Sequence, residues 1–358
     1  MKRRQFIKGL GATAVAAAAP AVHAQTPQIK WRLASSFPKS LDTIYGGAEL
    51  LADRVSTITE GRFQIRVFAA GELVPGLQVL DAVKAATVEC GHTASYYYVG
   101  KDKAFAFDCS VPFGLTARQQ NAWMYHGGGI KLLRELFAAH NIIQFPGGNT
   151  GTQMGGWFRK EVNTLADLKG LKMRIPGLGG DIMSRLGVVA QTIAGGDIYP
   201  ALERGTIDAA EWVGPYDDEK LGFYKVAKHY YYPGWWEPGP QLSFYINLAE
   251  WQKLPKAYQI AFETAAAEAN FDMLAAYDAK NPNALVQLIK NGVKLHKYPD
   301  DVLKEAQKEA FALFDDEAGK NPAFNKIYTE WRKFRTLQQG WFSLAESALE
   351  GFMYANRK

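Results

Sequence analysis

The sequence predicts an α/β protein of two lobes with a hinged cleft between them and a long helical C-terminal segment. Short apolar or alternating runs typical of strands are followed, repeatedly, by longer runs with the spacing of helices. Two stretches rich in Gly and Pro, residues 147–151 and 233–241, interrupt this pattern, and we interpret them as crossovers between the lobes. With 47% apolar and 13% aromatic residues, the chain can form folded cores.

The first lobe is expected to comprise residues 25–150. Alternating or apolar runs predict its strands, and apolar residues at helical spacing predict its helices. The predicted strands cover residues 29–34, 63–68, 93–98 and 142–145, and the predicted helices cover residues 42–59, 77–89 and 117–139. The last helix must bend or break at Gly127-Gly128-Gly129.

Residues 151–240 repeat the pattern and form the expected second lobe. Strands are predicted at residues 171–175, 188–193 and 207–213, and helices at residues 178–186 and 198–204. We assign residues 241–299 to a return into the first lobe, beginning with a strand at 242–247. This return includes a helical run, residues 261–288, that is long enough to extend past a single lobe.

The C-terminal segment, residues 300–358, is expected to be helical. One side of it is apolar at Phe311, Leu313 and Phe314. That side either packs against the rest of the same chain or covers a second copy, and the second alternative is the hypothesis of a homodimer.

The first 24 residues have the features of a cleavable export signal. A cationic start is followed by a Gly, Ala and Val stretch and by the small-residue site Val22-His23-Ala24. The apolar stretch is shorter than the roughly 18 residues of a membrane-spanning helix, so we expect neither an anchor nor direct membrane insertion. Residues 3–8, RRQFIK, approximate the twin-arginine pattern. The predicted location is the periplasm, reached by twin-arginine export.

Removal of this signal changes the electrostatic interpretation of the chain. It contains four of the 41 Lys and Arg residues and none of the 36 Asp and Glu residues, so the formal charge falls from +5 to +1. A nearly neutral mature chain gives no reason to expect nucleic acid or an anionic membrane as a partner.

Two cysteines, Cys90 and Cys109, lie in the same predicted lobe. An oxidising periplasm permits a disulfide between them. Two buried free thiols are the alternative, and the sequence leaves both open.

Two segments carry a resemblance to a known family. Residues 165–177, LADLKGLKMRIPG, and residues 197–212, DIYPALERGTIDAAEW, resemble signature segments of the binding subunits of TRAP (tripartite ATP-independent periplasmic) transporters. The resemblance extends over nearly all of the mature chain. It implies the two-lobed periplasmic solute-binding protein fold, a role in capturing a ligand rather than catalysis, and delivery of that ligand to membrane permease subunits.

Three further segments resemble the subgroup that binds 2-oxo acids such as pyruvate together with a metal ion. They are HTASYYYVGKDKAFAF at residues 92–107, VPFGLTARQQNAW at 111–123 and GGNTGTQMGGWF at 147–158. The expected ligand is therefore a small 2-oxo monocarboxylate. A 2-hydroxy acid such as lactate, held with Ca²⁺, or a sugar acid is the alternative.

Arg174 can be weighed without the resemblance. It is the last polar residue before Pro176-Gly177, at the carboxyl end of a predicted strand, where open α/β sheets place their ligands. A guanidinium fork can take a carboxylate through two parallel hydrogen bonds. The ordinary alternative is a solvated cation on a polar strand face. In the resembled family the matching arginine clamps the substrate carboxylate.

Glu211 follows the apolar residues Ile207, Ala209 and Ala210, which predict a buried strand. A buried carboxylate needs a cation, which either Arg174 or a metal ion could supply. The alternative is an acid that pairs with a surface lysine. The resemblance implies that Glu211 binds the ion.

The resemblance supplies further candidate ligands. It implies that the carbonyl of Trp212 binds the ion while its ring closes the pocket, and that the amide oxygen of Gln153 contacts both ion and ligand. Gln241, on the second crossover, completes this set. Tyr96 and Tyr97 are candidate ligand contacts on the turn that the resemblance places at the cleft; if residues 93–98 form a strand, their side chains point to opposite faces.

Charge counting favours a monovalent ion. Glu211 and a ligand carboxylate bring two negative charges, and Arg174 returns one positive charge. Na⁺ would make the site neutral, whereas Ca²⁺ would leave an excess positive charge and usually collects more anionic oxygens. We therefore predict Na⁺, with Ca²⁺ as the alternative.

The competing class is a secreted hydrolase acting on carbohydrate, in which Glu211 would pair with Asp208, Asp217 or Asp218. Asp208 lies three residues from Glu211 on one predicted strand, so the two face opposite sides. The two later acids follow Gly214-Pro215 and are expected to begin a helix. The sequence therefore favours a binding protein over an enzyme.

Overall fold

The computed structural model describes residues 27–357. The predicted export signal lies outside these residues. Within the described chain, no helix combines the length and the apolar character needed to cross a membrane.

The first lobe is built on a five-stranded mixed sheet with the order β2-β1-β3-β10-β4. β1 is parallel to β2 and β3, whereas β10 is antiparallel to β3 and β4. In β2, Phe63 and Ile65 are buried while Gln64 and Arg66 are exposed, as alternation predicts. The strand bounds are β1 (Ile29–Ser35), β2 (Phe63–Phe68), β3 (Cys90–Thr93), β4 (Ile142–Asn149) and β10 (Gln241–Asn247).

The helices of this lobe are α1 (Gly46–Ile58), α2 (Val79–Lys84), α3 (Ala106–Cys109), α4 (Ala117–His126) and α5 (Gly129–Ala138). The predicted break in the helical run 117–139 is confirmed. Gly128 has a φ of 88°, a left-handed conformation that glycine adopts without a Cβ clash, and it separates α4 from α5.

The second lobe contains a six-stranded sheet with the order β11-β9-β5-β8-β6-β7. Its strands are short: β5 (Trp157–Phe158), β6 (Lys172–Arg174), β7 (Val189–Gln191), β8 (Ala209–Ala210), β9 (His229–Tyr232) and β11 (Lys294–Lys297). The helices between them are α6 (Gly177–Arg185), α7 (Gly195–Glu203) and α8 (Pro215–Leu221). Asp217 and Asp218 lie in the first turn of α8, as predicted.

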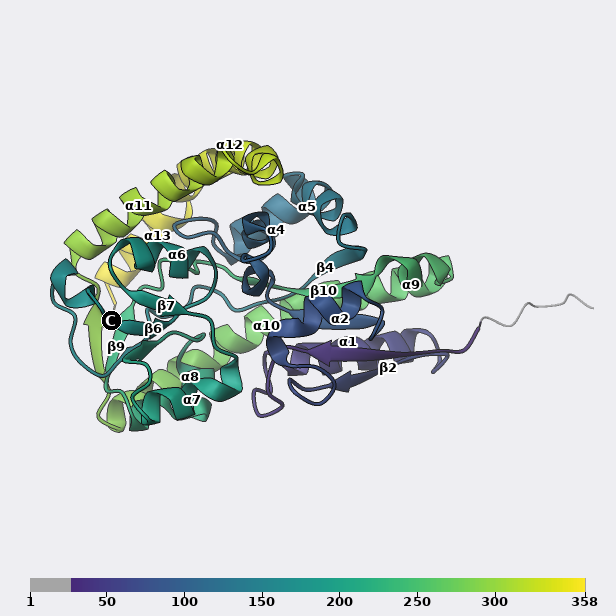
Figure 1. The fold of residues 1–358 in the computed structure, drawn as a ribbon, viewed down its shortest axis with the longest axis horizontal. Coiled ribbons are helices and arrows are strands. Elements are labelled where there is room, and N and C mark those ends of the chain that lie inside the picture. Colours follow the sequence, from purple (N-terminus) through teal and green to yellow (C-terminus); the bar gives the residue numbers. More distant parts are fainter. Residues whose placement is uncertain (1–26, 358) are drawn as a thin grey trace, which may run out of the picture.

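Three connections join the two sheets. The predicted crossovers are the links from β4 to β5 and from β9 to β10. The third is α10 (Lys256–Lys290), a 35-residue helix that follows α9 (Leu248–Lys253) and contacts both α1 and α8. Figure 1 shows α10 running along both lobes, as expected for the long helical run.

The domain boundaries predicted from sequence stay a prediction, with one exception. β11 pairs in parallel with β9, so residues 294–297 belong to the second sheet. Assigning all of 241–299 to the first lobe was therefore wrong, because the chain leaves α10 at the second lobe and adds an edge strand there.

The C-terminal segment is helical and forms α11 (Asp300–Ala318), α12 (Pro322–Leu344) and α13 (Glu346–Ala355). α11 packs on α6 of the second lobe, and α12 contacts α4 and α5 of the first, so the segment spans one side of both lobes. Leu313 and Phe314 are buried within this chain and Phe311 is partly buried against the same core. These three residues are therefore not an exposed face for a second copy.

Three local expectations differ from the structure. Residues 95–98 form a 3₁₀ turn after β3 rather than a continuous strand. Of the predicted strand 207–213, only Ala209 and Ala210 pair in the sheet. Cys90 and Cys109 are buried free thiols, so the disulfide alternative is wrong.

Candidate functional site

Arg174 and Glu211 meet at the carboxyl ends of two neighbouring parallel strands. β6 ends at Arg174, which lies opposite Ala210 of β8, and Glu211 follows directly. The guanidinium Nη1 donates to the Glu211 carboxylate and to the Glu211 carbonyl, 2.9 Å away, while Nε donates to the carbonyl of Ile193 at 3.0 Å. The two side chains are 1% and 0% exposed. This is a fully buried ion pair at the end of a sheet.

The pair leaves polar atoms on both partners without a hydrogen bond. Arg174 Nη2, Glu211 Oε2 and Gln153 Oε1 are buried and make no hydrogen bond of normal geometry. Burial raises the pKa of Glu211, and the proximity of Trp236, like that of Arg174, opposes the rise. Buried polar atoms are nearly always satisfied, so such atoms need an explanation. A guanidinium nitrogen can donate to a carboxylate, and carboxylate and amide oxygens are the donors that hard cations prefer. These residues therefore fit a carboxylate ligand and an oxygen-bound cation.

Trp212 covers the guanidinium of Arg174. The guanidinium carbon lies 5.1 Å from the centre of the indole ring, in a cation–π arrangement. Trp212 Nε1 donates to Asp217 at 3.3 Å, and the Tyr277 hydroxyl of α10 donates to the same carboxylate at 2.8 Å. A Cβ on Gly195 would lie 2.5 Å from the ring, so this position must be glycine for the ring to fit.

Tyr96 and Tyr97 reach the site from the first lobe. They lie in the 3₁₀ turn, where successive residues do not alternate as in a strand, and both line a small cavity with Gln153 and Trp212. The prediction that they point to opposite faces was therefore wrong. The cavity volume is about 10 Å³, close to the room for a single water molecule. Entry of a larger ligand requires the lobes to separate.

Gln153 lies on the first crossover and is fixed by its neighbours. Its Nε2 donates to the hydroxyl of Thr150 at 3.1 Å, and its backbone N donates to the carbonyl of Glu237 on the second crossover at 3.1 Å. The bond from Nε2 fixes the amide group, and its oxygen, Oε1, has no hydrogen-bond partner.

Gln241 belongs to a different cluster. Its Nε2 donates to Asp108 at 3.3 Å and contacts the hydroxyl of Ser243 at 3.2 Å, while its own Oε1 is buried and unpartnered. Ser95, Gln144 and Ser243 also donate to Asp108. The structure therefore places Gln241 beside a buried carboxylate that the sequence reasoning did not identify.

Glu237 is a second buried acid at the site that sequence reasoning missed. It is 2% exposed, and the hydroxyl of Tyr96 donates to it at 3.5 Å. Burial raises the pKa of Glu237 well above its usual value, the nearby Glu211 raises it further, and Arg174 opposes both. The available signal was the segment WWEPGP, in which a single acid lies between aromatic residues and prolines.

Burial dominates the electrostatics of the remaining acids. It raises the pKa of Glu211 to about 7, although the adjacent Arg174 opposes the rise. Burial also raises the pKa of Asp217 to about 7 and those of Asp108 and Asp218 to about 6.

The acids proposed as catalytic partners of Glu211 have other roles. Asp218 accepts hydrogen bonds from Trp157 at 2.9 Å and from Tyr230 at 2.6 Å. Asp217 holds Trp212, and Asp208 accepts from the backbone N of Lys172 at 3.0 Å. These contacts account for the acids as parts of the second lobe's framework.

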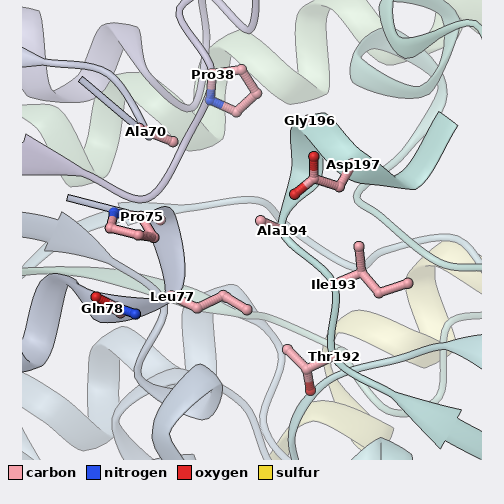
Figure 2. Close-up of a pocket in the computed structure, with 12 residues that line it drawn as sticks. Pro38, Ala70, Pro75, Leu77, Gln78, Thr192, Ile193, Ala194, Gly196 and Asp197 are labelled. Atoms are coloured by element: carbon pink, nitrogen blue, oxygen red, sulfur yellow. The ribbon is translucent and has the colours of Figure 1, made fainter. Parts of the chain in front are cut away.

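A larger opening between the lobes is lined in part by Ile193. It has a volume of about 620 Å³. Figure 2 shows Pro75 and Leu77 of the first lobe on one side and Ile193 and Asp197 of the second lobe on the other. The carbonyl of Ile193 is the one that accepts from Arg174 Nε. This opening therefore reaches the backbone that supports the buried site.

Two α/β lobes with an opening between them and a buried arginine at the end of one sheet are typical of an extracytoplasmic solute-binding protein. The chain belongs to the bacterial extracellular solute-binding proteins of family 7, whose model matches residues 34–320. The resemblance to TRAP transporter binding subunits is thereby confirmed.

Individual relatives agree with this family. The chain is 54% identical to a monocarboxylate 2-oxoacid-binding periplasmic protein of Nostoc sp., over 98% of its own length and 99% of that protein. A TRAP transporter solute-binding protein of Bordetella bronchiseptica, solved as a mixed-occupancy dimer with copurified calcium and picolinate, is 52% identical with a TM-score of 0.91, covering 92% of this chain and 98% of that one.

Two further solved TRAP solute-binding proteins have a TM-score of 0.88. The protein of Pseudoalteromonas atlantica, with bound sodium and pyruvate, is 38% identical, and that of Colwellia psychrerythraea, with bound calcium and pyruvate, is 36% identical. Each match covers 90% of this chain and 99% of the other.

The raised pKa of Asp217 predicts an unusual pH dependence of stability in protein free of ligand and cation. The folded state keeps a proton up to about pH 7, whereas the unfolded acid loses it near pH 4. The stabilisation is therefore present at low pH and is lost as pH rises through 7. Between pH 6.5 and 8, Asp217 should lower the free energy of unfolding by about 1 kcal/mol.

Urea unfolding at these pH values tests this expectation. The variant Asp217→Asn should lack this part of the decline, while Asp197→Asn, a change at an exposed acid, should retain it. Equal pH slopes in the wild type and Asp217→Asn would contradict the assignment.

Proposed function

We propose that this protein is the binding subunit of a TRAP transporter that captures a small 2-oxo monocarboxylate, of which pyruvate is the model, together with a cation. It delivers the ligand to separate membrane permease subunits and is not an enzyme. The observation that carries the proposal is the buried Arg174–Glu211 pair, in which one guanidinium nitrogen and one carboxylate oxygen have no partner. A carboxylate and a cation are the two groups that would satisfy them.

The ligand carboxylate would accept from Nη2 of Arg174. The neighbouring hydroxyl groups of Tyr96 and Tyr97, the amide of Gln153 and the ring of Trp212 would enclose the ligand. A 2-oxo acid carries a second oxygen next to its carboxylate, so it can chelate a cation held at Glu211. Picolinate, found in the Bordetella relative, presents a ring nitrogen in the equivalent position, which supports this chelating mode.

The cation would be held by Oε2 of Glu211, Oε1 of Gln153 and the backbone oxygen of Trp212. We also keep Gln241 as a proposed ligand contact, because its Oε1 is buried and has no hydrogen-bond partner. These are hard oxygen donors, which suit Na⁺ or Ca²⁺ rather than zinc.

Glu237 changes the charge count in favour of Ca²⁺. Its carboxyl is buried and electrostatically linked to both Glu211 and Arg174. A protonated Glu237 adds no charge and leaves a site that Na⁺ neutralises, whereas an ionised Glu237 brings the carboxylates to three negative charges against one from Arg174. Ca²⁺ makes this set neutral, whereas Na⁺ leaves one negative charge in a buried site. The calcium found in the 52% identical Bordetella relative supports the ionised state. We therefore propose Ca²⁺, in place of the Na⁺ favoured by the sequence.

Calorimetric titration of the mature protein tests the function. Pyruvate should bind in the presence of Ca²⁺ and lose most of its affinity when a chelator removes the Ca²⁺. Titration of lactate and of longer oxo acids then shows which class of acid binds best. Arg174→Lys keeps the charge beside Glu211 but removes the planar fork. We expect it to weaken pyruvate binding by about 2 to 5 kcal/mol.

Arg185→Lys is the matched control, since Arg185 forms partly exposed ion pairs on α6. Pyruvate affinity equal to wild type in Arg174→Lys would contradict the carboxylate clamp. Failure of every oxo and hydroxy acid to bind, with sugar acids binding instead, would overturn the proposed ligand class.

The choice of ion has its own test in Glu237→Gln. This change removes one negative charge while keeping the size of the side chain, so Na⁺ then makes the site neutral. Pyruvate binding should shift from dependence on Ca²⁺ towards dependence on Na⁺. The measurement is pyruvate affinity as a function of each ion, with the exposed Glu49→Gln as control. A wild type that already prefers Na⁺ would contradict the role of Glu237.

We propose that the precursor is exported to the periplasm through the twin-arginine route and cleaved after residue 24. The supporting observations are Arg3-Arg4 and the mild apolar stretch that follows. Unchanged export in cells without the twin-arginine translocase would contradict the route, but not the periplasmic location.

We propose further that the protein forms a homodimer through the ends of α12 and α13. Apolar side chains are 58% to 78% exposed there, at Leu337, Trp341, Leu344, Leu349, Phe352 and Tyr354. Such a continuous series of exposed apolar residues on two adjoining helices favours a protein partner. The relative solved as a dimer supports a second copy as that partner.

The double change Leu337→Glu and Leu344→Glu should convert the dimer to a monomer while pyruvate affinity stays unchanged. Sedimentation at micromolar concentration provides the measurement. Ile260→Glu, at an exposed apolar residue on α10, controls for the introduced charge. A wild-type protein that sediments only as a monomer would overturn the homodimer.

A further inference from the structure

Glu161, His229 and His296 gather at the far edge of the second sheet, in a cluster that shares no residue with the proposed ligand site. The two rings approach each other at 3.0 Å, from His229 Nδ1 to His296 Nε2. Oε1 of Glu161 lies 3.6 Å from the first nitrogen and 3.9 Å from the second. Three potential metal ligands thus present one atom each to a common point.

Neighbouring segments of the sheet supply these three residues. β5 and β9 are antiparallel with Phe158 opposite His229, and Glu161 follows β5 by a short segment. β9 and β11 are parallel with Tyr231 opposite His296, so the two histidines are diagonal neighbours on one face of the sheet. The cluster therefore depends on sheet register and not on a flexible surface arrangement.

The ring of His296 is held in place by Tyr231. The two rings stack at 5.0 Å with an angle of 19° between their planes. The Tyr231 hydroxyl accepts from the backbone N of Val162 at 2.7 Å, next to Glu161 in the chain. The same tyrosine therefore orders one histidine and the segment that carries the carboxylate.

The spacing of the three atoms fits a metal ion of the size of zinc. A triangle with sides of 3.0, 3.6 and 3.9 Å has a circumradius of about 2.1 Å, so one point lies that far from all three atoms. Zinc–nitrogen and zinc–carboxylate bonds are about 2.0 to 2.2 Å long. A tetrahedral site has ligand atoms about 3.3 Å apart, and the three separations here average 3.5 Å.

We propose that Glu161, His229 and His296 form a binding site for a divalent transition-metal ion of the zinc type. Two imidazoles and a carboxylate suit zinc and exclude Ca²⁺ and Mg²⁺, which select oxygen ligands. The His229 and His296 side chains are 15% and 22% exposed and Glu161 is 43% exposed, so a fourth position faces solvent and takes water. The bound ion joins β11 to β9 and to the segment after β5.

This site acts on the connection to the C-terminal helices. β11 is the edge strand between α10 and α11, and its only strand partner in the described sheet is β9. A metal ion that binds the folded cluster and not the unfolded chain raises the stability of this edge by mass action. Zinc should therefore secure the start of α11 to the second lobe without altering the ligand site.

The test is titration of Zn²⁺ into the mature protein, purified without a polyhistidine tag and kept in Ca²⁺ and pyruvate. We expect one Zn²⁺ per chain with micromolar or tighter affinity, and a rise in Tm on addition of Zn²⁺. His229→Gln and His296→Gln should each weaken Zn²⁺ binding about 100-fold or more, and Glu161→Gln should weaken it less. Pyruvate affinity should stay unchanged in all three variants.

The control is His126→Gln, at an exposed histidine at the end of α4. It should leave Zn²⁺ binding unchanged. Zinc binding that persists in the variant with both His229→Gln and His296→Gln would overturn the proposal, and so would a wild type that binds no Zn²⁺ at millimolar concentration. In that case the two histidines are a hydrogen-bonded pair that joins β9 to β11. This test does not depend on the proposed ligand, because it compares the Zn²⁺ affinity of the histidine variants with that of the wild type. A protein that binds no pyruvate can still confirm or overturn the zinc site.

Discussion

The buried ion pair between Arg174 and Glu211 is the constraint on which the site depends. Removing two charges from water is expensive, and a buried pair is tolerated only when its geometry and additional hydrogen bonds compensate. Here the carbonyls of Glu211 and Ile193 supply those bonds. The pair forms only if β6 and β8 lie side by side and end together. The chemistry of the site therefore depends on the strand order of the second sheet.

The sequence singled out both partners because each has a strong local signal, but it left Arg174 and a metal ion as alternative cations for Glu211. Arg174 precedes Pro176-Gly177 at a strand end, and Glu211 follows a small apolar strand. The same reasoning failed for Tyr96 and Tyr97, since three tyrosines in a row satisfy strand propensity equally well. In the structure the hydroxyl of Ser95 bonds to that of Tyr245, and the hydroxyl of Tyr98 accepts from the backbone N of Leu80. These partners come from other elements of the fold, which no local pattern contains.

Glu237 and Gln241 show the same limit at the crossovers. Their segment has no helical or strand period, and Pro and Gly indicate only a turn. Glu237 interacts with residues from both lobes: Tyr96 of the first lobe donates to it, and burial raises its pKa while Arg174 of the second lobe opposes this rise. Similarly, no local feature indicates that β11 joins β9 across more than sixty residues of sequence, because parallel pairing is set by where α10 ends.

The placement of the polar groups links ligand capture to lobe closure. Arg174 and Glu211 come from the second lobe, Tyr96 and Tyr97 from the first, and Gln153 and Glu237 from the two crossovers. A carboxylate and a cation that contact all of them bind the closed arrangement better than any open one, and only such a difference in affinity can shift a conformational equilibrium. Burial raises the pKa of Glu237 well above its usual value, so a divalent ion held as proposed would have to offset the cost of ionising this acid in the closed arrangement. Under the proposed function the cation would be part of closure, and the permease would receive a subunit whose conformation reports that both ligand and ion are bound.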